Sequence, residues 1–126
     1  MATARRRVDV KEGRAALDAW LEAARSPSDA PLPRNVLATA VRYTLEEVTA
    51  RAPGNSVEVR VPPYSAIQVI PGVRHKRGTP PAVIETDAET WIALATGDLS
   101  WVDAEASGKV TASGERADLT PYLPLT

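Results

Sequence analysis

The chain has 126 residues, of which 15 are basic and 16 acidic, so its formal net charge is −1. This near-neutral balance provides no overall field that would attract nucleic acid or an anionic membrane surface. Because the sequence contains no cysteine, disulfides, a catalytic thiolate and cysteine-ligated zinc are all excluded.

The length predicts one domain, because domains typically run to roughly 100–200 residues. We expect residues 1–8 to be a flexible start and residues 9–126 to form the single domain. Arg5-Arg6-Arg7 could begin a signal peptide, but no apolar stretch follows it, and none approaches the roughly 20 residues of a membrane span. The sequence therefore predicts a cytoplasmic protein without a transmembrane segment. Twelve arginines against three lysines, with abundant alanine, are typical of a GC-rich bacterial genome.

A first helix is predicted between Asp9 and Ser26. Asp9 and Glu12 have the spacing of a capping box, which satisfies free N–H groups at the start of a helix. Pro27 disfavours helical geometry in the residue before it and so ends the helix. The apolar face consists of residues three or four positions apart, namely Leu17, Trp20, Leu21 and Ala24.

A second helix is predicted from Asn35 to about Ala52. It ends at Pro53-Gly54-Asn55, because proline, glycine and asparagine are residues typical of turns. Its apolar stripe has helical spacing and is widened by neighbouring residues: Leu37, Val41, Leu45 and Val48 form the stripe, with Val36, Ala40 and Tyr43 beside it.

Three strands are predicted next. In residues 57–61, valines alternate with charged residues, which is typical of a strand with one buried face and one solvent-facing face. Pro62-Pro63 separates this strand from a second one at 66–70, and a third follows at 82–86. The loop between the last two is basic and contains Arg74, His75, Lys76 and Arg77.

A short capped helix and a last strand complete the predicted fold. Thr86 or Asp87 can cap a helix that Gly97 closes in a left-handed conformation, with Glu89 at capping-box spacing from Thr86. Residues 108–114, framed by two glycines, are a fourth strand, and the tail forms a further helical turn. Helices followed by strands, then a helix and a strand, predict an α+β fold with a mostly antiparallel sheet.

These last segments have a familiar order. A strand end, a capped helix and a glycine follow one another in Thr86–Leu99. A strand with the pattern Gly-x-Val-x-x-x-Gly comes next, at Gly108–Gly114, and a closing helix follows at Ala117–Leu123. With the long helix and the valine-rich hairpin upstream, this pattern resembles a small bacterial member of the sterol carrier protein family over most of residues 35–123. The resemblance implies a twisted sheet covered by helices, with an apolar pocket between the two layers.

The resemblance also implies a function. We expect the protein to bind or carry a hydrophobic or amphipathic small molecule, such as a lipid, fatty acyl chain or sterol, without catalysing a reaction. No residues form a nucleophile–base pair or a metal site by sequence signature, so we expect no enzyme activity and no cofactor. The candidate pocket walls come from the long helix, the sheet, the capped helix and the segments after it: Val41, Leu45, Ile67, Val69, Trp91, Leu94, Trp101 and Leu119.

A ligand-free scaffold that binds another protein is the alternative hypothesis, because an alanine-rich core can pack shut. Trp91 and Trp101 are then ordinary core residues, since tryptophan at helical spacing with Ile and Leu usually serves packing. The basic loop is either solvated or contacts a phosphate such as a headgroup. Nucleic-acid binding needs a wider basic face with interleaved aromatic residues, which the sequence lacks. Trp20, on the first helix, is expected to lie away from the pocket.

Overall fold

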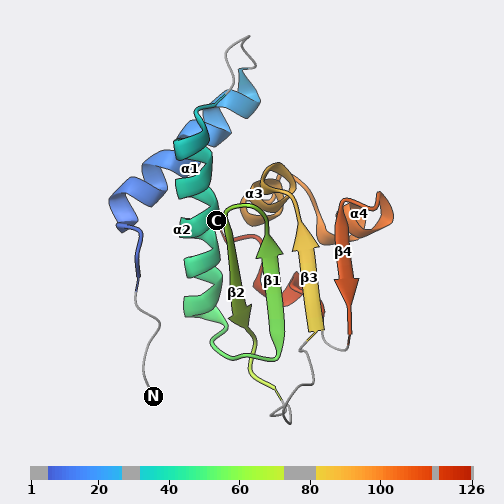
Figure 1. The fold of residues 1–126 in the computed structure, drawn as a ribbon. Coiled ribbons are helices and arrows are strands. Elements are labelled where there is room, and N and C mark those ends of the chain that lie inside the picture. Colours follow the sequence, from blue (N-terminus) through green and yellow to red (C-terminus); the bar gives the residue numbers. More distant parts are fainter. Residues whose placement is uncertain (1–5, 27–31, 73–81, 115–116, 126) are drawn as a thin grey trace.

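A computed structural model describes residues 6–26, 32–72, 82–114 and 117–125 of the chain (Figure 1). Two helices come first, followed by three strands, two helices, a strand and a 3₁₀ turn. Their bounds are α1 (Val10–Arg25), α2 (Arg34–Arg51), β1 (Val57–Val61), β2 (Ser65–Val69), β3 (Ala82–Thr86), α3 (Ala88–Thr96), α4 (Trp101–Ala106), β4 (Val110–Ser113) and η1 (Thr120–Tyr122). The α+β prediction is confirmed.

The four strands form one sheet in the order β2-β1-β3-β4. β1 pairs antiparallel with β2, and β3 pairs antiparallel with β4, so the sheet is mostly antiparallel as predicted. The central pair is different, because β1 and β3 run parallel, with Val57 opposite Ala82. β3 therefore begins at the same end of the sheet as β1. Alternating side chains predict a strand but do not reveal the direction of its neighbour.

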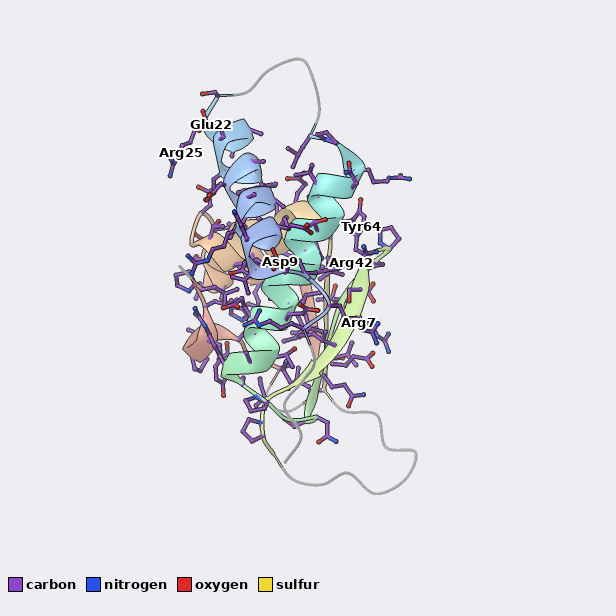
Figure 2. The ribbon with its side chains drawn as sticks, turned by 90° about the vertical axis from the view of Figure 1, so that its left-hand side faces the viewer. Arg7, Asp9, Glu22, Arg25, Arg42 and Tyr64 are labelled. Carbon is purple, nitrogen blue, oxygen red and sulfur yellow. The ribbon has the colours of Figure 1, made fainter. Side chains whose placement is uncertain are left out.

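The helices gather on one face of this sheet. In Figure 1, α3 and α4 lie behind the strands and α2 runs beside β2; in Figure 2, α2 lies between α1 and the sheet. The strands bury alternate residues toward the helices, including Val57, Val59 and Ile84, while Arg60 and Glu85 on the other face are exposed. The predicted period of two in β1 therefore separates the core face from the solvent face.

α1 packs on α2 through a close approach at Gly13. Asp9 caps α1 as predicted, since its carboxylate accepts a hydrogen bond of 3.2 Å from the N–H of Glu12. Gly13 is buried against the ring of Tyr43 on α2, with no room for a side chain. A hydrogen bond with the Tyr43 side chain raises the pKa of the neighbouring Arg14. The helix pair is thus in contact where the backbone of Gly13 meets the ring of Tyr43.

Residues just before α1 also lie against α2. The Glu46 carboxylate accepts hydrogen bonds from the backbone N–H of Arg7 at 2.9 Å and of Val8 at 3.2 Å, and Arg6 pairs with Glu47. These three residues belong to the start that the sequence predicts to be flexible. Residues 1–5 of that start lie outside the described part of the chain.

α4 is a helix that the sequence analysis does not predict. Its N-cap is Ser100, whose side chain accepts a hydrogen bond of 3.1 Å from the N–H of Asp103. Ser100 and Asp103 have the spacing of an N-terminal cap, which is the signal that could have revealed this helix. Six residues are less than two helical turns, so no apolar periodicity develops that would support the cap.

The core is rich in valine, leucine, isoleucine and alanine, and its aromatic side chains are Trp20, Tyr43, Trp91 and Trp101. Within the described ranges, every buried side-chain nitrogen or oxygen has a hydrogen-bond partner. None of the described helices combines the length and the apolar character needed to cross a membrane. The buried polar side chains of the described residues are therefore fully hydrogen-bonded.

Candidate functional site

The structure brings the eight predicted wall residues into one apolar cluster. They come from α2, β2, α3, the start of α4 and the segment before η1. Seven are buried, with exposed fractions of 0–7%, and Ile67 is half-buried and packs against the others. The buried seven are Val41, Leu45, Val69, Trp91, Leu94, Trp101 and Leu119. The cluster thus lies between the helices and the sheet.

Trp91 is the largest of the fully buried side chains in this cluster. Its indole N–H donates a hydrogen bond of 2.8 Å to the hydroxyl of Thr44 on α2, and that hydroxyl donates to the carbonyl of Ala40 at 2.7 Å. The bond joins α3 to α2 in the interior. Since the exposed fraction of both side chains is 0%, no water competes for it in this conformation.

Sequence reasoning missed Thr44. It is a polar position inside the apolar stripe of α2, next to Leu45 and three residues from Val41. A threonine on the buried face of a helix, in a protein whose tryptophans need hydrogen-bond partners, is the signal that was available. Thr44 supplies a buried hydroxyl within the predicted site.

Removing the Thr44 hydroxyl should leave the indole N–H of Trp91 buried without a partner. We expect Thr44→Val to lower the free energy of unfolding by about 1–2 kcal/mol, measured by urea denaturation. Thr44→Ser, which keeps the hydroxyl, is the matched control and should retain the bond. In a Trp91→Phe background the valine substitution should cost less; an equal cost in both backgrounds would contradict the hydrogen bond.

Ile67 lies at the rim of the cluster because β2 is an edge strand. It faces Val59 across the β1–β2 ladder and is less buried than Val69 on the same side of the strand. β2 is also the strand on which α2 packs. The rim between α2 and β2 is therefore a border of the candidate site.

Trp20 and Glu89 have roles that the sequence did not indicate. The indole N–H of Trp20 donates a hydrogen bond of 2.6 Å to a carboxylate oxygen of Glu89, so this buried tryptophan joins α1 to α3. The cap of α3 is Asp87, whose carboxylate accepts from the N–H of Thr90 at 2.8 Å. Trp20 thus contacts a helix that supplies wall residues.

Gly97 closes α3 as predicted. Its φ of 85° lies in the left-handed region, and its N–H donates to the carbonyl of Leu94 at 3.3 Å. The N–H of Leu125 donates to Ala95 at 2.7 Å, so the end of the chain packs over the end of α3. This arrangement brings Leu119 and the tail onto the same cluster.

The basic loop with Arg74, His75, Lys76 and Arg77 lies outside the described residues. Among the residues that are described, no group of three or more histidine or carboxylate side chains is arranged to hold a metal ion.

A protein-family model described as bacterial SCP ortholog, where SCP stands for sterol carrier protein, matches residues 33–125. The chain belongs to this family. The match includes every element from α2 to η1 and all eight wall residues, whereas α1 precedes it. Membership in the sterol carrier protein family points to lipid carriage in general. No curated protein sequence matches the chain.

Proposed function

We propose that this protein binds and carries an apolar or amphipathic small molecule, such as a lipid, fatty acyl chain or sterol, between its helices and its sheet. The observation that supports this most directly is the apolar cluster of eight side chains from both layers, in a chain of the sterol carrier protein family. The driving force would be burial of apolar surface, at roughly 25 cal/mol per Å². A non-catalytic role in the cytoplasm is part of the proposal.

Seven of the eight wall residues are buried, and Ile67 packs against them from the rim. A ligand between the helices and the sheet would contact these side chains, and one that also moved α2 away from α3 would break the bond between Trp91 and Thr44. The Thr44 hydroxyl would then be available to the polar end of an amphipathic ligand. Ile67, at the edge of the sheet, marks the rim at which α2 and β2 would part.

A ligand-free scaffold that binds another protein is the second candidate. Two observations favour it: Trp91 is fully buried, and no buried polar side-chain atom of the described residues lacks a partner. Such a core is complete without a ligand. Under this hypothesis the eight residues stabilise the fold and the functional surface lies elsewhere.

Substitutions that fill the core distinguish the two functions. We expect Leu94→Trp and Val69→Trp to abolish binding of a fluorescent fatty acid, NBD-stearate, because the added ring occupies the space of the ligand. Emission of the probe would be followed during titration, and stability would be measured by urea denaturation. Val102→Trp, at a position that is 71% exposed, is the matched control and should bind like the parent protein.

The scaffold hypothesis predicts a different pair of results. The parent protein would not bind NBD-stearate, and overpacking a full core would cost roughly 1–3 kcal/mol of stability. Native mass spectrometry, followed by organic extraction of the purified protein, tests for a retained lipid independently. If no lipid is extracted and the probe does not bind, the carrier proposal is wrong.

A further inference from the structure

A recess opens between the ends of α1 and α3, and none of the eight wall residues lines it. Its volume is about 220 Å³, and residues of both helix ends line it: Leu21, Ala24 and Arg25 on one side, Thr96, Gly97 and Asp98 on the other. Since α1 precedes the residues that match the family, half of this lining comes from a segment outside the family match.

Two opposite charges line this recess without meeting. Arg25 and Asp98 are both exposed, and neither forms an ion pair or side-chain hydrogen bond with another residue in the described part of the chain. Figure 2 shows Arg25 at the end of α1 with Glu22 one turn before it; that carboxylate does not pair with Arg25 either. A guanidinium and a carboxylate are thus both available to a molecule in the recess.

The position of Asp98 is unfavourable by itself. It follows Gly97, the C-cap of α3, where the helix dipole presents its negative end and repels a carboxylate. The last turn of α3 contains no basic residue that would offset this repulsion. A cationic group entering the recess would offset the repulsion between the helix end and the Asp98 carboxylate. Arg25, in contrast, has the favourable position of a cation in the last turn of α1.

We propose that this recess binds a small zwitterion. Its anionic group contacts Arg25, its cationic group contacts Asp98, and a short aliphatic part lies against Leu21 and Ala24. Because small-molecule pockets usually measure roughly 300–1,000 Å³, the ligand is smaller than most. A free amino acid and the phosphoethanolamine headgroup of a lipid both have this chemistry. Exposed charges are screened by water, so we expect affinities of about millimolar.

The experiment is a titration of the ¹⁵N-labelled protein, followed by amide chemical shifts. The probes are L-leucine and glycerophosphoethanolamine, compared with two analogues of leucine that each keep one charge, 4-methylpentanoate and 3-methylbutylamine. We expect shifts around Gly97, Asp98 and Arg25, and zwitterion binding about three- to tenfold tighter than that of either analogue. Binding of glycerophosphoethanolamine alone would identify a lipid headgroup as the source, and binding of leucine alone a free amino acid.

Charge-removing variants test the assignment of each group. Arg25→Gln should reduce zwitterion affinity to that of the amine, and Asp98→Asn to that of the carboxylate. Arg42→Gln and Asp103→Asn, at exposed positions elsewhere, are the matched controls and should change nothing. If neither zwitterion shifts these amides, or if Arg25→Gln and Asp98→Asn bind like the parent, the proposal is wrong. NBD-stearate binding by the same variants is expected to be unchanged, so this result is independent of the carrier proposal.

Discussion

Trp91→Ala is expected to lower the free energy of unfolding by about 3–5 kcal/mol, which is the usual range for removing a buried large aromatic side chain. The indole has an exposed fraction of 0% and lies in the cluster that joins α2, α3 and the sheet. Its loss leaves a cavity and also removes the hydrogen bond to Thr44. Urea denaturation followed by far-ultraviolet circular dichroism measures the effect without relying on the removed fluorophore.

The matched control for Trp91→Ala is Val102→Ala, which truncates a side chain that is 71% exposed. That change should alter stability by no more than about 0.5 kcal/mol. A loss below about 1 kcal/mol for Trp91→Ala would contradict the tight packing around the indole. It would favour an interior with free space around the indole, which is what a ligand pocket between the helices and the sheet needs.

Gly13→Ala is expected to destabilise the protein by about 1–3 kcal/mol, although the same change usually stabilises a helix by roughly 0.5–1 kcal/mol. A Cβ atom at Gly13 would lie 2.3 Å from Cγ and Cδ1 of the Tyr43 ring and 2.7 Å from its Cβ. The near atoms include the base of the side chain, so a rotation of the ring does not relieve the overlap. The helices α1 and α2 must then move apart. Urea denaturation measures the loss.

Ala15→Gly, at an exposed position two residues along α1, is the control for ordinary helix propensity. It should cost roughly 0.5–1 kcal/mol, as glycine does in a helix interior. The sign of the Gly13→Ala effect is therefore decisive. A stabilising effect would mean that α1 does not approach α2 at this point.

Much of the candidate site could be predicted from the sequence. The wall residues were chosen from apolar stripes at helical spacing and from strand alternation, and these patterns show which face of an element is buried. Once a fold is assigned, buried faces must meet, so Val41 on α2 and Trp91 on α3 lie in one cluster. The partner of each polar atom was not predictable in this way. Trp20 and Glu89 are 69 residues apart in the chain, and nothing local to either one indicates the other.

Ile70 shows how tertiary structure overrides a local preference. Its φ of 71° is left-handed, a conformation that β-branched residues rarely adopt. Its N–H donates to the carbonyl of Ala52 at 2.7 Å, and its own carbonyl accepts from the N–H and hydroxyl of Ser56 at 3.2 and 2.6 Å. These bonds join the end of α2 to the base of the hairpin. They hold a backbone conformation for which the sequence around Ile70 contains no signal.

The sequence by itself determined the elements whose signals lie within about one helical turn or a few strand residues: the cap at Asp9, the left-handed end at Gly97 and the alternation in residues 57–61. Caps and periodicity act between residues close in the chain, so they operate before distant segments meet. Tertiary structure alone decided the parallel pairing of β1 with β3, the bond between Trp91 and Thr44, and the contact of Trp20 with Glu89. Each of these contacts joins segments that are far apart in the chain, so it forms only when the whole domain folds. The free energy that stabilises these contacts comes from the burial of apolar side chains from all the elements of the core.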